Sequence, residues 1–277
     1  MNMPSTDQDN AEAQLRAGHP EAALSLLQAE IRRQPANSKL RIFLFQLLAI
    51  LGQWDRAMNQ LNVAAELDVS ALAMAQMYRE ALRCEVLRSE VFAGKRAPLV
   101  FGEPEQWLAL LVESLLVAGR GQQTEAAALR DRAFELAPAT PGRIDGAPFE
   151  WLADADGRLG PVCEAIINGS YYWIPFSRLS RIDIEAPTDL RDYVWAPAHF
   201  QFSNGGEAVG VIPTRYPGSE QEADGAIKLA WRTEWLVHAG DYRGLGQRLF
   251  ATDQGDFALL DIRRVDLGNA ERGNIDD

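Results

Sequence analysis

The feature that most constrains the fold is a repeat in the first half of the chain. Three positions recur at an interval of 34 residues, so that Gly18, Ala23 and Leu27 return as Gly52, Ala57 and Leu61. This interval is the length of a tetratricopeptide unit, which is a pair of antiparallel helices joined by a short turn. Because one such hairpin cannot cover its own apolar face, successive hairpins must stack. The repeat therefore predicts an array of helical hairpins.

The residue types at the repeated positions have physical reasons. A glycine ends the first helix of each unit because the turn there needs a left-handed residue. Small alanines in the second helix let two helix axes approach closely, and a proline ends that helix. Ala126, Ala133 and Pro138 predict a third hairpin further along the chain. Two features depart from the repeat: Phe45 stands where a small residue is usual, and residues 70–92 predict one long helix. The alternative is therefore an unrelated helical bundle with accidental self-similarity.

The second half of the sequence has a shorter periodicity. Short aromatic or β-branched runs predict strands at residues 162–168, 171–175, 193–200, 208–212 and 257–263. Asn168-Gly169, between the first two runs, is a strong hairpin signal because this pair suits a type I′ turn. Residues 230–239 fit either a strand or a helix. We expect a compact, mostly β module that packs on the helices.

Chain length and a change of composition predict two domains. At 277 residues the chain is longer than one ordinary hydrophobic core needs. Residues 138–148 are rich in Pro, Gly, Thr and Asp, which is typical of a linker or a domain junction. We therefore expect an α+β protein, with tetratricopeptide-like helical repeats at residues 1–140 and a mostly β domain at residues 141–277.

Charge and cysteine content restrict the class of partner and the location. The net charge is -12, and such an acidic surface repels phosphate backbones, so we expect no nucleic acid and favour a basic or mixed-charge protein partner. Cys84 and Cys163 lie in different halves without a nearby partner, which favours a reduced, cytoplasmic protein. The most apolar run, residues 42–51, contains Gln46 and is too short to span a bilayer, and residues 1–10 are too polar for a signal peptide. We expect a soluble protein without membrane insertion.

The most site-like string is Asp-Ala-Asp-Gly-Arg at residues 154–158. It shares Asp-x-Asp-Gly with calcium loops, but the remaining ligands and the closing glutamate are missing. The favoured interpretation is a turn whose carboxylates accept hydrogen bonds from backbone amides and pair with Arg158. The less favoured alternative is an enzyme that uses Asp154, Asp156 or Glu164 as an acid or base. We expect no catalytic residue, no metal site and no cofactor.

Three strings carry a resemblance to a known family. They are Gly-His-Pro-Glu-Ala-Ala at residues 18–23, Gly-Gln-Trp-Asp-Arg-Ala at residues 52–57, and Phe-Glu-Trp-Leu-Ala-Asp-Ala-Asp-Gly-Arg-Leu-Gly-Pro at residues 149–161, which Asn-Gly-Ser-Tyr-Tyr-Trp-Ile-Pro follows at residues 168–175. With these strings the chain resembles the ImpE family over nearly its whole length. The members of this family in bacterial type VI secretion are called TagJ.

The resemblance implies an accessory component of the type VI secretion apparatus that binds other proteins. It implies two partners: the N-terminal helix of the small contractile-sheath subunit TssB, and the ATPase ClpV, which disassembles contracted sheaths. It supplies no catalytic residue. A chaperone for secretion substrates is the alternative function that helical repeats also allow.

A partner surface is predicted from the geometry of tetratricopeptide arrays, in which the first helix of each hairpin lines a concave groove. In the second unit this face presents Lys39, Ile42, Gln46 and Ala49. Ile42 and Ala49 offer apolar contact to a bound helix or extended segment, and Lys39 and Gln46 fix its orientation. Two alternatives stay open, since Ile42 can pack on a neighbouring repeat and the partner can bind the aromatic second half instead.

Overall fold

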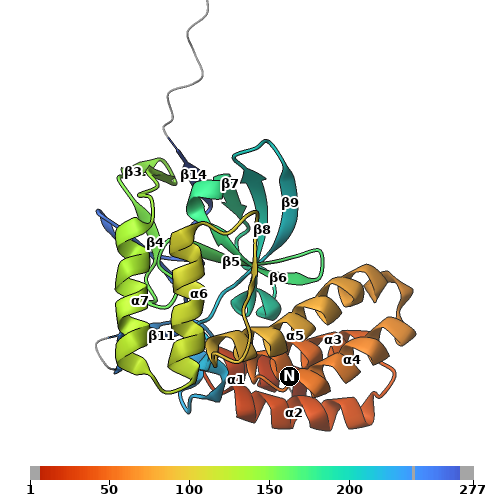
Figure 1. The fold of residues 1–277 in the computed structure, drawn as a ribbon. Coiled ribbons are helices and arrows are strands. Elements are labelled where there is room, and N and C mark those ends of the chain that lie inside the picture. Colours follow the sequence, from red (N-terminus) through yellow and green to blue (C-terminus); the bar gives the residue numbers. More distant parts are fainter. Residues whose placement is uncertain (1–6, 239–240, 269–277) are drawn as a thin grey trace, which may run out of the picture.

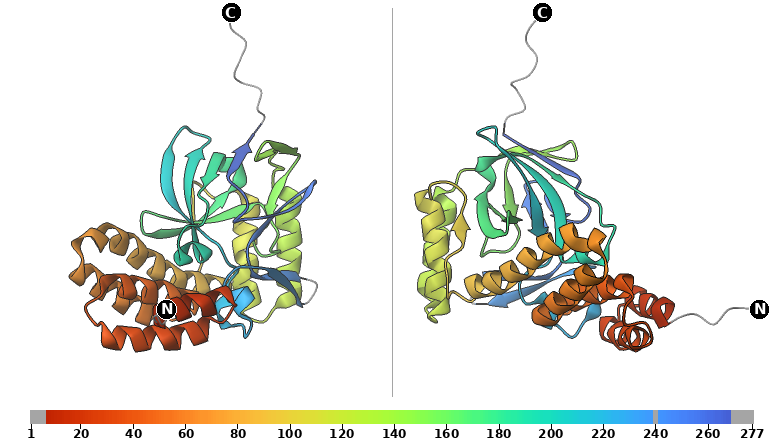
Figure 2. Two further views of the ribbon diagram at one scale, coloured as in Figure 1. Left: turned by 180° about the vertical axis from the view of Figure 1, so that it is seen from behind. Right: turned by 90° about the vertical axis from the view of Figure 1, so that its right-hand side faces the viewer.

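The first part of the chain is helical in the computed structural model, which describes residues 7–238 and 241–268 (Figure 1). The helices are α1 (Asp7–Arg16), α2 (Pro20–Arg33), α3 (Ser38–Ile50), α4 (Trp54–Leu67), α5 (Leu72–Phe92), α6 (Gln106–Gly119) and α7 (Gln123–Leu136), with a 3-10 turn at Val69–Ala71 before α5. Helices α1 to α5 form one layer below the large sheet. The α6–α7 hairpin stands apart from this layer, on another side of the sheet (Figure 2).

A glycine in the left-handed region closes each predicted hairpin turn. Gly18, Gly52 and Gly121 have φ of +81°, +65° and +85°, and they lie in the turns α1–α2, α3–α4 and α6–α7. Ala126 and Ala133 are buried on α7, where the third hairpin needs small residues. The three hairpins and the long helix α5 are confirmed. Their assignment to the tetratricopeptide class stays a prediction.

The second part of the chain consists mainly of strands. Its elements are β2 (Gly142–Ile144), β3 (Ala147–Phe149), β4 (Leu152–Asp154), β5 (Val162–Ile167), β6 (Ser170–Pro175), β7 (Leu179–Ile184), β8 (Trp195–Phe202), β9 (Glu207–Pro213), the short helix α8 (Gly225–Lys228), β10 (Thr233–His238), β11 (Asp241–Gly246), β12 (Leu249–Thr252), β13 (Gly255–Ala258) and β14 (Arg264–Leu267), with 3-10 turns at Phe176–Arg178, Leu190–Tyr193 and Ser219–Gln221. Within the described residues, the large sheet has the order β1-β6-β5-β9-β8-β7-β14-β2-β3, and two small sheets are β10-β11 and β13-β12-β4. Strand β1 (Leu99–Val100) comes from the segment between α5 and α6 and pairs parallel with β6.

Most predicted strands are present with small shifts at their ends. β5, β6, β8 and β9 correspond to the first four predicted runs. Asn168 and Gly169, with φ of +50° and +75°, make the turn that joins β5 to β6. These positive values are why Asn-Gly is needed there, since both central residues of a type I′ turn are left-handed.

One interpretation of the second half is wrong, one is narrowed, and one ambiguity is resolved. Of the two alternatives for residues 138–148, a linker is excluded over β2, because this strand pairs with β3 as a hairpin, and a domain junction stays a prediction. Residues 257–263 hold only the end of β13, since the chain turns after Ala258. Of the ambiguous residues 230–239, the described ones form a turn at Ala230 (φ +55°) and then strand β10.

The buried apolar residues form two clusters. The first is shared by the helices and by the face of the sheet that they cover, and its rings pack across that boundary: Tyr78 on Trp195 at 5.6 Å and Phe92 on Trp173 at 6.1 Å. The second lies within the strand-bearing part. The division of the chain at residue 140 stays a prediction. No helix among the described residues is long and apolar enough to cross a membrane.

Candidate functional site: a buried charge network

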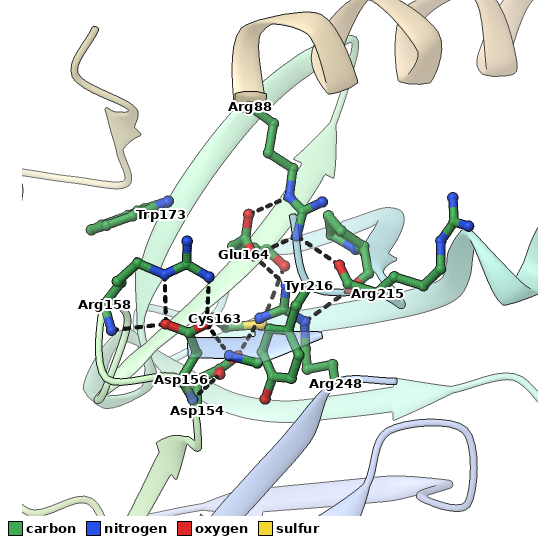
Figure 3. A network of polar contacts seen from close by, with 12 residues as sticks. Arg88, Asp154, Asp156, Arg158, Cys163, Glu164, Trp173, Arg215, Tyr216 and Arg248 are labelled. Carbon is green, nitrogen blue, oxygen red and sulfur yellow. Dashed lines mark hydrogen bonds and ion pairs between the residues drawn. The ribbon is translucent and has the colours of Figure 1, made fainter. Parts of the chain in front are cut away.

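Several buried charged side chains gather where helix α5, strand β5, the end of β4 and the start of β12 meet (Figure 3). Glu164, in the middle of β5, is fully buried. Its Oε1 accepts a hydrogen bond from Arg88 Nε at 2.6 Å, and its Oε2 accepts one from Arg88 Nη2 at 3.1 Å. Two parallel bonds of this kind are the strongest pairing available to a carboxylate. Since Arg88 lies on α5, this pair joins the helical layer to the sheet.

Arg248 extends the network to the small sheet. It precedes β12, is fully buried, and donates to the carboxylates of both Glu164 and Asp154. Its Nε donates to the Pro213 carbonyl oxygen at 2.8 Å, and its guanidinium lies 5.2 Å from the centre of the Tyr216 ring. One cation therefore ties the end of β4 to the middle of β5.

The Asp154–Arg158 string is the turn that the sequence predicts. The Asp156 N–H donates to Asp154 Oδ1 at 2.9 Å, and the Arg158 N–H donates to Asp156 Oδ1 at 2.9 Å. The Arg158 guanidinium pairs with Asp156 at 2.8 Å through Nε and at 2.6 Å through Nη2. The turn interpretation is confirmed. The turn also reaches further than expected, because Asp156 Oδ2 accepts a hydrogen bond from the Gly244 N–H of β11 at 2.9 Å.

A second arginine fastens the helices to the strand-bearing part through backbone oxygens. Arg215, beyond the end of β9, donates to the carbonyl oxygens of Ile50 at 2.7 Å and Ala49 at 3.2 Å. Its own carbonyl oxygen accepts a hydrogen bond from Arg88 Nη2 at 2.8 Å. Burial lowers the pKa of Arg215 to about 10. The last turn of α3 is thus closed by a side chain from the second half.

The network shifts the ionisation of its carboxyl groups in opposite directions. Burial by itself raises the pKa of Glu164, but the guanidinium groups of Arg88 and Arg248 outweigh it and hold this pKa at about 2. Burial raises the pKa of Asp154 to about 7, against the opposing effect of Arg248. Burial also raises the pKa of Glu85, which lies 3.4 Å from Arg88. Glu164 is therefore the ionised centre of the network, and Asp154 is its titratable edge.

Both cysteines are buried, and Cys163 lies beside this network (Figure 3). Burial raises the pKa of the Cys163 thiol and that of the Cys84 thiol. Thiols are nucleophilic as thiolates, so neither side chain is prepared for nucleophilic chemistry.

The arrangement connects elements of the fold and is closed to solvent. The exposed fractions of Glu164, Asp156 and Asp154 are 0 %, 0 % and 3 %, whereas a general acid or base must reach a substrate. A hollow of about 430 Å³ touches Asp154, but the carboxylate itself is 0 % exposed and faces Arg248. The three carboxylates of the enzyme hypothesis are thus occupied by arginines and amides of the chain itself.

The four residues of the predicted partner surface lie on α3 but differ in accessibility. Lys39 is exposed and Ile42 is half-buried. Gln46 is 6 % exposed and Ala49 is 0 % exposed, because the second half of the chain covers this end of α3. Only Lys39 and Ile42 can therefore meet a partner without a rearrangement. The partner surface on α3 stays a prediction.

Sequence reasoning found the acidic turn and missed the basic side chains that complete the network. Arg88 stands in the long helix, and Arg215 and Arg248 stand in loops without a motif. One available signal is composition, since Lys39, Lys95 and Lys228 are the only lysines beside many arginines. The planar arginine fork suits fixed, buried pairing better than an ammonium group does.

A family model described as "ImpE protein" matches residues 146–266, a range that contains the acidic turn and the strands joined by Arg248. The chain is also 52% identical to a curated relative over 257 residues, which is 93% of this chain and 90% of the relative. The chain therefore belongs to the ImpE family, and the resemblance carried by the three strings is confirmed.

The curated relative is the type VI secretion system accessory component TagJ of Pseudomonas aeruginosa. Among solved structures, the fold is similar to the crystal structure of protein VPA1032 from Vibrio parahaemolyticus, with a TM-score of 0.86 and 25% sequence identity. The similarity covers 95% of this chain and 98% of the Vibrio chain, so the arrangement of helices and sheet is shared over the whole length.

Proposed function

We propose that this chain is a non-catalytic, cytoplasmic accessory protein of a bacterial type VI secretion system, and that it acts by holding another protein. The observation that carries the proposal is the 52% identity to TagJ over 93% of the chain, since so high an identity over nearly the whole length rarely separates two functions. The burial of Asp154, Asp156 and Glu164 supports a role without catalysis, because no substrate can approach them.

The proposed partner is the N-terminal segment of the small sheath subunit TssB, with the ATPase ClpV as a second partner that the chain would link to the sheath. The acidic surface, with a net charge of -12, favours a partner segment that carries basic residues. The proposed contact is the accessible part of the predicted surface, Lys39 and Ile42 at the start of α3. Gln46 and Ala49 would then support this surface from behind.

A titration of a labelled TssB N-terminal peptide tests this proposal. We expect binding to the wild-type chain and a loss of about tenfold or more in Ile42→Asp, because a buried carboxylate replaces an apolar contact. Val69→Asp is the control for the added charge, since Val69 is 77 % exposed and lies outside the proposed surface. Gln46→Arg is not suitable because it would place a charge in the core.

Two results would change the proposal. Equal binding by wild type and Ile42→Asp would move the contact away from α3. No binding of TssB or ClpV, together with recovery of secreted substrates from cells that express the tagged chain, would favour a chaperone for secretion substrates.

A further inference from the structure

The ribbon of β10 and β11 forms a small sheet of its own, separate from the large sheet. Its strands are antiparallel, with Thr233 opposite Gly246, Trp235 opposite Gly244 and Val237 opposite Tyr242. A two-stranded ribbon is marginally stable by itself in water. Contacts with the rest of the protein must therefore stabilise the ribbon.

The protein holds this ribbon along the β11 edge. Two hydrogen bonds join β11 to the acidic turn: the Tyr242 carbonyl oxygen accepts from the Gly157 N–H at 2.9 Å, and the Gly244 N–H donates to Asp156 Oδ2 at 2.9 Å. Two more bonds are made by Gly246, whose N–H donates to Ser219 Oγ at 2.8 Å and whose carbonyl oxygen accepts from the Tyr216 N–H at 3.0 Å. The turn therefore fixes the ribbon as well as the charge network.

The pairing pattern leaves the β10 edge open. In an antiparallel ladder, two residues directly opposite each other either bond to one another or both point their N–H and C=O groups outward. Since β11 uses its outward groups to bond to the body, Thr233, Trp235 and Val237 point theirs away from the ribbon. Within residues 7–238 and 241–268, no hydrogen bond to these outward groups is found.

The side chains of the ribbon do not protect this edge. Leu236, Val237 and Tyr242 are 51 %, 67 % and 59 % exposed. The pairing of β10 with β11 has no bulge, and β10 contains no proline or lysine. Soluble proteins usually cover or charge an open edge, because it is a template for another strand. An edge that is open, held in place and apolar at Leu236 and Val237 suits the addition of a partner strand.

Charge favours another protein over a second copy of this chain. At the start of β10, Arg232 Nη2 lies 2.7 Å from Glu234 and also pairs with Asp224, so two carboxylates share this one guanidinium group. The chain as a whole has a net charge of -12, which opposes the approach of two copies.

We propose that the β10 edge takes an extended segment of a partner protein by strand addition. The segment carries apolar residues beside Leu236 and Val237 and a basic residue near Glu234. This proposal rests on the proposed function, that the chain holds another protein of the secretion apparatus, and it adds a second contact remote in sequence from α3.

The test uses full-length TssB as the probe and two matched variants. Val237 on β10 and Val209 on β9 are 67 % and 69 % exposed, so Val237→Lys and Val209→Lys place the same charge on two similarly exposed strand positions. We expect Val237→Lys to weaken binding about tenfold and Val209→Lys to leave it unchanged. Hydrogen exchange should slow at the amides of Thr233, Trp235 and Val237 in the complex, which side-chain contact alone would not cause.

Four other results would contradict the proposed site, its occupant or its partner. Wild-type affinity in Val237→Lys with unchanged exchange along β10 overturns the strand-addition site. Loss of binding in Val209→Lys alone moves the contact to the hollow that Val209 of β9 lines together with Met77 and Glu80 of α5. A doubled mass in light scattering that Val237→Lys returns to that of one chain assigns the edge to a second copy instead. No binding of TssB to the wild-type chain overturns TssB as the proposed partner, and the inference with it.

Discussion

Glu164 is a carboxylate without solvent contact that stays ionised because two arginines surround it. Its bonds to Arg88 come from the helical layer, and its bond to Arg248 comes from a loop 84 residues further along the chain. Removing charges from water costs several kcal/mol per ion, and only complete pairing offsets that cost. The contribution of Glu164 to the free energy of unfolding is therefore measured by removing one member of the pairing.

Glu164→Gln should be strongly destabilising. The substitution leaves Arg88 and Arg248 buried with too little negative charge, and breaking a buried pair in this way costs about 3–5 kcal/mol. Chemical denaturation measures the effect. Glu207→Gln is the control, since Glu207 is an exposed partner of His199 and should change the free energy of unfolding by less than about 0.5 kcal/mol. Similar small effects in both variants would contradict the central role of Glu164.

Asp154 makes stability depend on pH in the direction opposite to Glu164. Its folded pKa is about 7, whereas an unfolded aspartate has a pKa of about 3.9. Between these values the folded state keeps a proton that the unfolded chain has released, so this group removes stability as the pH rises. Glu164, with a pKa of about 2, instead contributes stability that is lost as the pH falls below about 4.

The prediction for Asp154 concerns the difference between wild type and Asp154→Asn. As the pH rises from about 4 to about 7, the free energy of unfolding of wild type should fall relative to that of the variant, whose side chain cannot ionise. Urea denaturation at several pH values measures this difference. A difference that is constant over the window would show that Asp154 is already ionised at low pH.

At this scale the sequence predicted the local part of the network and none of the distant part. The turn could be predicted because Asp154, Asp156 and Arg158 satisfy one another within a few residues. The pairing of Arg88 with Glu164 spans 76 residues. Such a pair depends on how α5 packs on β5, and no spacing rule in the sequence encodes that.

At the scale of elements, left-handed glycines determine where helices and strands turn. The sequence showed this for Gly18 and Gly52, because they recur at the repeat interval. It could not show that the later end of α3 is covered. Gln46 and Ala49 were predicted to face a groove, but they are buried because the chain's own second half packs there and Arg215 bonds to the carbonyl oxygens at this end of α3.

Gly246 and Gly205 separate backbone strain from crowding. Both have φ of +85°, but a Cβ at Gly205 meets nothing within 4 Å, whereas a Cβ at Gly246 would lie 2.0 Å from the Arg232 carbonyl oxygen. We expect Gly205→Ala to cost about 1–2 kcal/mol from the left-handed conformation alone. Gly246→Ala should cost clearly more, because the backbone at the start of the ribbon must move. Equal losses by chemical denaturation would show that the ribbon adapts freely.

At the scale of the whole molecule, the helical layer and the large sheet share apolar contacts. Tyr78 packs on Trp195 and Phe92 on Trp173, and Arg88 crosses the same boundary. The fold class followed from the repeat and the β-branched runs. The shared core did not, because side-chain pattern reveals which face of an element is apolar but not which other element covers it.

A fragment of residues 1–140 tests how far the helices stand by themselves. We expect helical circular dichroism and a cooperative melt, because each helical hairpin buries part of its apolar surface locally. The melting temperature should be lower than that of the full chain, because the fragment lacks Glu164, the partner of Arg88. It also lacks Trp195 and Trp173, on which Tyr78 and Phe92 pack. A fragment without helical signal would contradict the predicted domain. A fragment that melts like the full chain would contradict a shared core.

The position of Arg248 also affects the order of events during synthesis. A ribosome releases α5 with Arg88 first, Glu164 comes 76 residues later, and Arg248 follows after another 84. At about 5 to 20 residues per second, roughly 8 s or more pass before the last of the three emerges. Until then the apolar face of the nascent helices is exposed to solvent. This interval is therefore the period in which general chaperones of the cell would bind the nascent chain.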